Sequence, residues 1–309
     1  MEQKQEFETY YVPEQSKLPI FASLGLFLTV FGLGNWLNEM SAEKEGSGVT
    51  VFLLGFVVLA AVLFTWFSKA IDENIKGLNS VQLKRSYVWG MGWFIFSEVM
   101  FFAAFFGALW YLRNISLPHL GEGPTSELLW NDFKADWPLM TTPDMALNGE
   151  AAAITGPEAT MGNPGFSKWL TWLPFINTAI LISSSVTVHW AHTALKKDNK
   201  KAFNFWLGFT VLLGFIFLCV QVYEYKHAYT DLGLTLNAGV YGTTFFMLTG
   251  FHGLHVTMGT FMLFVQWLRS VTKGHFSHSD CFGFEASSWY WHFVDVVWVG
   301  LFIFVYILG

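Results

Sequence analysis

Long runs of apolar residues recur along the chain and are separated by short polar segments. An α-helix needs roughly 20 apolar residues to cross about 30 Å of hydrocarbon, and seven of these runs approach or exceed that length. We therefore expect seven transmembrane helices, an odd number that places the two termini on opposite sides of a membrane. The predicted helices span residues 18–38, 46–68, 86–112, 169–195, 202–227, 239–268 and 285–308.

The polar segments complete the prediction of an all-α integral membrane fold, with a single membrane domain over residues 1–309. Residues 1–17 fit neither a secretory signal nor a transit peptide, so we expect a short N-terminal segment on the inner side. The connection 113–168 is rich in Pro, Gly and acidic residues, and its apolar periodicity is weak. It is predicted to be a long outer loop, packed against a partner or partly mobile, rather than a second domain.

Composition supports a membrane protein and narrows its chemistry. Hydrophobic residues make up 53% of the chain and charged residues only 13%, about half the share of a soluble domain. The formal net charge of −6 gives no basic patch, so nucleic acid is not an expected partner. Cys219 lies in an apolar run and Cys281 in a polar loop, which indicates neither a disulfide framework nor a cysteine metal site.

The distribution of Lys and Arg predicts the orientation, because inner loops of membrane proteins carry an excess of both. With the N-terminus inside, the inner segments hold 12 of the 17 basic residues and the outer loops hold five. The excess recurs at every inner loop. The N-terminus is therefore expected inside and the C-terminus outside.

Four ionisable residues are predicted to share one layer near the middle of the membrane. At a rise of 1.5 Å per residue, Glu98 and Asp295 each lie roughly 15 Å from the inner helix ends. His292 and His255 fall about 5 Å on either side of that depth. Because a lone buried carboxylate is costly, we expect Asp295 to pair with His255 or His292.

This layer has two readings. A proton relay would need a continuous chain of groups reaching both faces, whereas static polar contacts between helices need only local partners. The outer halves of the predicted helices contain no deep acid or histidine except Glu224, at the end of the fifth. The sequence therefore favours static contacts, and Asp295→Asn is expected to affect assembly or stability more than proton flux.

Nine histidines make metal binding a further alternative. His252 and His255 are spaced i, i+3, as are two histidines of the fourth predicted helix, and this spacing can place two imidazoles on one helix face. Glu224 and His227 match one element of a di-iron bundle, but such a site needs two elements and further carboxylates. We expect structural histidines, no metal site and no catalytic residue in this chain.

Basic residues cluster at the inner mouth of the third predicted helix. Lys84 and Arg85 begin that helix, and Lys69 and Lys76 precede it. The cluster suits anionic lipid head groups. The ordinary inner-side excess of positive charge explains it equally well.

Several long segments resemble a known family. Residues Gly239–Thr260 (GVYGTTFFMLTGFHGLHVTMGT) and Phe282–Trp298 (FGFEASSWYWHFVDVVW) resemble helices six and seven of cytochrome c oxidase subunit III. Phe96–Trp110 looks like its third helix, and the run from Pro174 to His192 looks like its fourth. The similarity extends over most of the chain from the third helix onward.

The resemblance implies a place in a haem–copper oxidase that reduces oxygen with electrons from cytochrome c and pumps protons. In that family this subunit binds no haem or copper, which belong to partner subunits, and it packs on the catalytic subunit. Subunits I and II of the oxidase are the expected protein partners, with cytochrome c as an indirect one. Subunit III sustains proton uptake and protects the catalytic subunit. Helices one and two splay from the other five around a V-shaped cleft filled by phospholipid, and Glu98 matches the family's membrane-embedded carboxylate. The residues that we assign to a lipid or buried polar site are Trp66, Arg85, Glu98, His252, His255, Arg269, Lys273, Glu285, His292 and Asp295.

The outer loop is longer than in compact mitochondrial members of the family. This favours a bacterial cytoplasmic membrane, with a cytoplasmic N-terminus and a periplasmic C-terminus.

Two other functions are alternatives to an oxidase subunit. An independent seven-helix receptor or transporter should show a polar ligand cavity or a central lysine, and no predicted helix has such a lysine. A membrane di-iron enzyme lacks enough ligands.

Overall fold

The computed structural model describes a helical protein, and the described residues contain no β-strand. They fall into two compact units, Met1–Gly90 and Met91–Gly309. The third long helix runs across the boundary between them. The residues described are 11–12, 14–130, 133–276 and 281–309.

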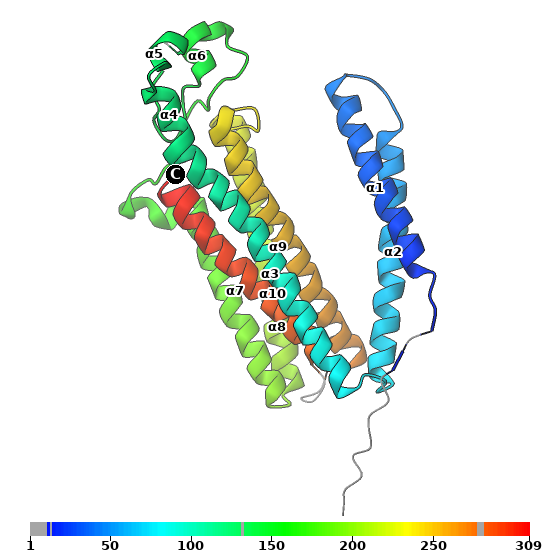
Figure 1. Ribbon diagram of the computed structural model, residues 1–309. Helices are drawn as coiled ribbons and strands as arrows, with labels where there is room; N and C mark the ends of the chain where they lie inside the picture. Colours follow the sequence, from blue (N-terminus) through cyan, green and yellow to red (C-terminus); the bar gives the residue numbers. More distant parts are fainter. Residues whose placement is uncertain (1–10, 13, 131–132, 277–280) are drawn as a thin grey trace, which may run out of the picture. The chain divides into compact units, whose positions relative to one another are not determined.

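The first unit is built around two long helices that lie side by side (Figure 1). A Cβ atom added at Gly32 would lie 2.2 Å from the backbone nitrogen of Phe52, and one at Gly55 would lie 2.4 Å from that of Thr29. Small residues therefore let the two backbones approach closely, as in other membrane helix pairs. The elements of this unit are α1 (Leu18–Ser41), α2 (Gly48–Ile75) and the first turns of α3 (Val81–Tyr111).

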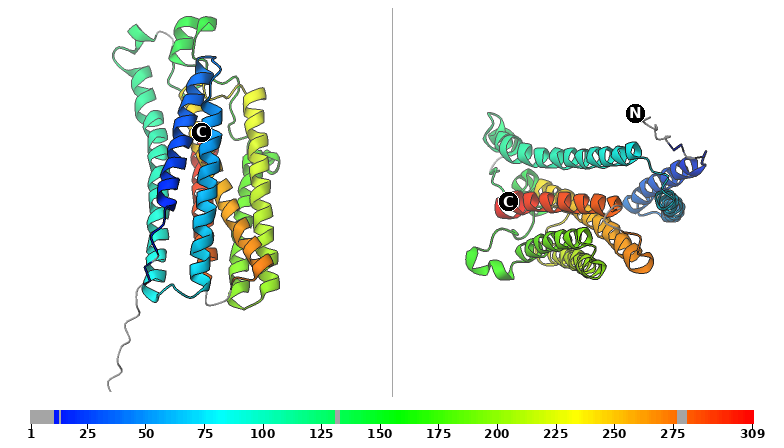
Figure 2. Two further views of the ribbon diagram at one scale, coloured as in Figure 1. Left: turned by 90° about the vertical axis from the view of Figure 1, so that its right-hand side faces the viewer. Right: turned by 90° about the horizontal axis from the view of Figure 1, so that it is seen from below.

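The second unit is a bundle of long helices (Figure 2). The rest of α3 belongs to it, and the last long helix, α10, continues into a π-helix, η4. Its core is dominated by aromatic side chains. The further elements are α7 (Leu173–Lys196), α8 (Lys200–Asp231), α9 (Gly239–Lys273), α10 (Phe282–Leu301) and η4 (Phe302–Ile307).

Trp291 is the side chain around which three of these helices pack. It is fully buried. A Cβ atom at Gly259 of α9 would lie 2.9 Å from Trp291 Cε3, and one at Gly214 of α8 would lie 2.8 Å from Cη2. The two glycines therefore leave the space that the indole fills, and a larger residue at either position would overpack the core.

The segment predicted to be an outer loop packs on one end of the bundle in its own unit. Leu117 and Leu139 are buried, and the Trp137 ring meets the Tyr241 ring of α9 edge to face at 5.5 Å. The loop thus has a partner within its own chain, an arrangement that the sequence did not indicate. Its elements are η1 (Leu112–Ser116), α4 (Leu117–Glu122), α5 (Ser126–Leu129), α6 (Pro143–Asn148), η2 (Gly149–Ala151) and η3 (Phe166–Thr171).

Six helices among the described residues are long and apolar enough to cross a membrane. They are α1, α2, α3 with its continuation to Glu122, α8, α9, and α10 with its continuation to Ile307. The helix at the fourth predicted position, α7, is 24 residues long, the same length as α1. Its Ser, Thr, Asn and His residues make it more polar and leave it outside this set. The structure therefore supports a multi-pass protein, while the seventh crossing remains a prediction.

The helices differ from the predicted spans mainly at their ends. The third helix begins at Val81 rather than 86, and α9 extends to Lys273 rather than 268. Hydropathy marks only the apolar part of a helix, whereas hydrogen bonding continues into its polar ends. In contrast, α7 begins at Leu173 rather than 169, because a 3-10 helix precedes it and Pro174 occupies its first turn, where proline is well tolerated.

Candidate functional site

Glu98 of α3 and His255 of α9 form a contact at mid-helix depth. His255 Nε2 lies 2.8 Å from Glu98 Oε2, and the two side chains are 9% and 23% exposed. The rings of Phe101 and Phe102 pack beside the imidazole. Glu98, which lies in a phenylalanine-rich stretch of α3, therefore has a polar partner on another helix.

The other nitrogen of His255 limits how this pair can hold protons. Nδ1 lies 2.6 Å from the Phe251 carbonyl oxygen, and because a carbonyl only accepts, Nδ1 must donate. The contact between Nε2 and Glu98 then contains a single shared proton. The pair is either an imidazolium with a carboxylate or an imidazole with a carboxylic acid.

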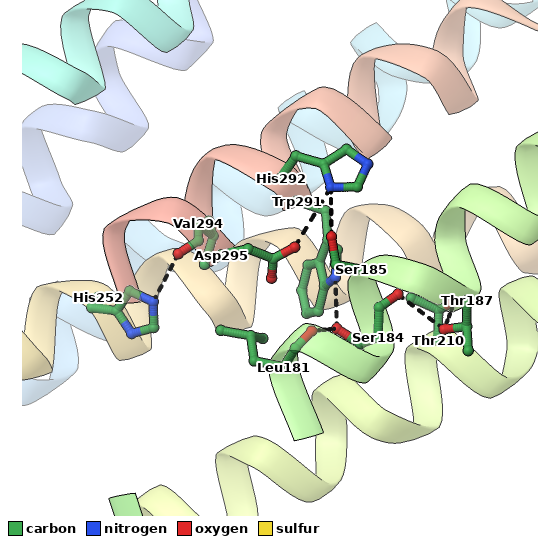
Figure 3. Close-up of polar contacts among 10 residues, drawn as sticks. All are labelled: Leu181, Ser184, Ser185, Thr187, Thr210, His252, Trp291, His292, Val294 and Asp295. Carbon is green, nitrogen blue, oxygen red and sulfur yellow. Dashed lines mark hydrogen bonds and ion pairs between the residues drawn. The ribbon is translucent and has the colours of Figure 1, made fainter. Parts of the chain in front are cut away.

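Asp295 and His292 form a second pair on α10. His292 Nδ1 lies 3.6 Å from Asp295 Oδ2, a distance that fits an ion pair and exceeds a good hydrogen bond. Ser185 Oγ of α7 lies 2.8 Å from the same nitrogen. Of the two partners predicted for Asp295, the structure has His292, because His255 is engaged by Glu98. Figure 3 shows Asp295, His292 and Ser185 converging between α10 and α7.

His252 lies on α9, one turn from His255, and is fully buried. Its Nε2 donates to the Val294 carbonyl oxygen of α10 at 3.2 Å (Figure 3). A ring edge of Phe217 faces it, and the Trp298 ring lies 5.0 Å away. This imidazole therefore joins α9 to α10 and does not face the other histidines as a metal ligand would.

Hydrogen bonds between uncharged side chains fix α7 against its neighbours. Trp291 Nε1 donates to Ser184 Oγ at 3.0 Å, and Trp298 Nε1 donates to Thr178 Oγ1 at 2.9 Å. Between α7 and α8, the hydroxyls of Thr187 and Thr210 are 2.8 Å apart. These bonds are polar contacts between helices of the kind that join membrane bundles, and Figure 3 shows the Trp291 and Thr187 bonds.

At the end of the second unit where α9 ends and α10 begins, two of the assigned residues make polar contacts and a third is exposed. Glu285 Oε1 lies 3.1 Å from His192 Nε2. Arg269 donates to Gln266 Oε1 at 2.8 Å, and its guanidinium lies 4.9 Å from the Phe276 ring centre. Lys273 is exposed in the last turn of α9. Arg269 and Lys273 thus place two basic side chains at this end of the unit.

The remaining two assigned residues belong to the first unit. Trp66 on α2 is 44% exposed, and Arg85 is exposed in the first turns of α3. Among the described residues, no group of three or more His, Cys, Asp or Glu side chains is placed to hold a metal ion.

The structure also reveals a buried acid to which the sequence assigned no site. Glu224 has 0% exposure, and Gln221 and Tyr306 beside it are 5% and 2% exposed. Tyr306 interacts with both. Sequence reasoning treated Glu224 as lying at a membrane edge because its helix was expected to end near residue 227. Since α8 continues to Asp231, the acid lies two turns inside.

The chain matches a known protein family over both units. Residues 8–126 and 169–309 match the sequence model described as cytochrome c oxidase subunit III. The unmatched residues between these ranges belong to the outer loop, with the short helices α6 and η2. The loop is therefore the part of the chain in which it departs from the family pattern.

Individual relatives agree with the family match. The chain is 36% identical to cytochrome c oxidase subunit 3 of Drosophila melanogaster and of Anopheles gambiae, and 33% identical to that of Loxodonta africana. Each alignment covers 97% of this chain and 97% of the relative. The similarity is thus to the whole length of these proteins.

Proposed function

Because the chain belongs to the cytochrome c oxidase subunit III family, we propose that it is a non-redox subunit that stabilises the catalytic subunit of the oxidase. Membership places it in a membrane complex of aerobic respiration. Haem and copper centres are then expected in the partner subunits I and II. In this role the chain sustains proton uptake by its neighbour, and cytochrome c is an indirect partner.

The observation that carries this proposal is that the mid-depth polar groups contact partners within the second unit. Glu98 pairs with His255, His292 with Asp295 and Ser185, and His252 with a backbone carbonyl. Each contact joins side chains or backbone of the second unit to one another. Static bonds of this kind support a structural role, and they leave the oxygen chemistry to other subunits.

Phospholipid is the proposed non-protein partner. Long apolar helices with many exposed Phe, Leu and Val side chains suit acyl chains, and the exposed Lys273 with Arg269 suits anionic head groups. The division into a unit around α1 and α2 and a second unit of five long helices parallels the two-plus-five arrangement. A lipid-filled V-shaped cleft and a seventh crossing by α7 belong to this proposal.

A bacterial cytoplasmic membrane, with the N-terminus in the cytoplasm and the C-terminus in the periplasm, completes the proposal. The excess of Lys and Arg in the inner segments supports the orientation. The outer-loop residues outside the family match support a source other than compact mitochondrial forms.

The test compares the whole oxidase with the isolated chain. The purified chain should be colourless and free of stoichiometric iron or copper, and it should co-purify with a haem-bearing partner. In the assembled oxidase, Asp295→Asn should lower the yield or thermal stability of the complex while proton pumping per electron is kept. Normal assembly with abolished pumping, or a metal centre on this chain alone, would overturn the structural role.

A further inference from the structure

Three buried polar side chains meet where α8 approaches the C-terminal π-helix. Glu224 and Gln221 lie one turn apart on α8, and Tyr306 comes from η4. Their exposed fractions are 0%, 5% and 2%. Solvent therefore does not reach any of them from the surface of the described chain.

None of the polar atoms in this cluster has a hydrogen-bond partner among the described residues. These atoms are both carboxyl oxygens of Glu224, both amide atoms of Gln221 and the Tyr306 hydroxyl. An unsatisfied buried polar group costs about 1–3 kcal/mol, and native proteins rarely leave several together. Tyr306 interacts with both of the other side chains, yet none of the five atoms reaches hydrogen-bond geometry with another. A buried water molecule typically bridges polar groups placed in this way.

We propose that Glu224, Gln221 and Tyr306 form a binding site for an internal water molecule, with Glu224 present as the neutral acid. The phenol and the acid each supply one donor, the amide supplies two, and all three groups supply acceptors. A water with two donors and two acceptors can therefore bond to all of them. No second carboxylate is needed.

The surroundings favour water and a proton over a bound cation. No ion pair reaches Glu224 among the described residues. Hard cations are held by six or more oxygen ligands, often with several carboxylates, whereas this cluster offers a single carboxyl group. The aromatic rings of Phe245 and Trp298 pack against Tyr306 and further exclude a hydrated ion.

The site would join the end of the chain to the outer half of α8. In η4 the backbone has the wider π-helical turn, and such turns occur often where a side chain is re-aimed toward a site. Tyr306 then reaches the α8 acid, while Arg113 of η1 donates to the Leu308 carbonyl oxygen nearby. The bound water and this contact together hold the C-terminal segment in place.

Infrared spectroscopy of the whole purified oxidase tests the protonation state. The difference spectrum of wild type minus Glu224→Gln should show the carbonyl stretch of one protonated carboxylic acid at neutral pH. Tyr306→Phe should shift the frequency of that band, because one hydrogen-bond partner is lost. Loss of carboxylate bands in the Glu224→Gln spectrum would instead show an ionised group and overturn the proposal.

A high-resolution map of the same complex tests the water directly. Density for one water within hydrogen-bond distance of all three side chains is the expected result. Density of a metal ion, or side chains bonded directly to one another, would contradict the site. Both outcomes are independent of whether the chain stabilises the catalytic subunit, since the oxidase can be assembled with or without this bridge.

Thermal unfolding of the variants provides a third readout. Glu224→Gln keeps the size and the hydrogen-bonding capacity of a neutral acid, so the melting temperature of the complex should stay unchanged. Glu224→Leu removes the polar group and leaves Gln221 and Tyr306 without their bridge, so the melting temperature should fall. Equal destabilisation by both variants would show that the charge of Glu224 is needed and would overturn the neutral acid.

Discussion

His255 is bonded through both ring nitrogens, to the Phe251 carbonyl oxygen at 2.6 Å and to Glu98 at 2.8 Å. The first bond fixes a proton on Nδ1, so the second contact holds one proton between Nε2 and the carboxyl group. This relationship joins α3 to α9 within the second unit. It also explains how a carboxyl group can lie among phenylalanines without an arginine or lysine partner.

Substitution of Glu98 should therefore depend on the hydrogen-bonding capacity of the new side chain. Glu98→Gln can donate its amide proton to the neutral imidazole, and the loss of stability should be small. Glu98→Leu leaves Nε2 of His255 buried without a partner, which should cost about 1–3 kcal/mol. Thermal unfolding of the purified complex measures the difference. If the Gln variant is as unstable as the Leu variant, a charged pair is required.

Adding one methyl group to the core beside Trp291, by the substitution Gly259→Ala, should destabilise the protein. The Cβ atom of Gly259→Ala would lie 2.9 Å from the indole, so the ring must shift against its bond to Ser184. Overpacking of this kind costs typically about 1–3 kcal/mol. The matched control is Gly253→Ala on the same helix, where a Cβ atom meets nothing within 4 Å. Alanine should slightly favour the helix there, so comparable loss of melting temperature in both variants would contradict the packing account.

The contact between α1 and α2 gives a second matched pair. In Gly32→Leu the side chain would meet the backbone of Phe52 and should separate the two helices. At Gly34, two residues away on α1, a Cβ atom has open space. Cysteine crosslinking between the helices should fail in Gly32→Leu and persist in Gly34→Leu. Crosslinking that persists in both would show that the helices do not need this close approach.

The outer loop should lose local order in acid because of Asp144. Hydrogen bonds from the Ile154 backbone, the Asn148 side chain and the Ala153 backbone hold the pKa of Asp144 below its usual value. A carboxyl group with a lowered folded-state pKa contributes stability above its unfolded-state pKa, and this contribution disappears as pH falls through the folded value.

Hydrogen exchange, corrected for its intrinsic pH dependence, should show residues 149–155 protected at neutral pH and unprotected below the folded pKa of Asp144. In Asp144→Asn this change of protection with pH should be absent. An identical acid transition in that variant would assign it to another group.

The sequence predicted the helices where hydrophobicity alone decides them. The spans from 18, 46, 202 and 239 lie within or close to α1, α2, α8 and α9, because an apolar run of that length has no other stable form in lipid. The match of Gly239–Thr260 and Phe282–Trp298 to the family is confirmed by the comparisons. Both results depend on long stretches rather than single residues.

Side-chain partners were harder to predict. Counting residues along each helix placed Glu98, His255 and Asp295 at similar depths in the membrane. The count does not show which faces of the helices meet, so two partners for Asp295 were predicted. The rotation of α3 and α9 that joins Glu98 to His255 leaves His292 as the neighbour of Asp295. A four-residue error at the end of α8 likewise placed Glu224 near the helix end, although it is fully buried.

The contacts that hold α1 against α2 all lie within this helical hairpin. Its close contacts involve glycines of the two helices, and the backbone N–H of Gly48 at the start of α2 is shared between the two oxygens of the Glu39 carboxylate. All of these groups belong to α1, α2 and the turn between them, which are synthesised before the long helices of the second unit. The pair can therefore form in the bilayer during synthesis, before the remaining helices exist.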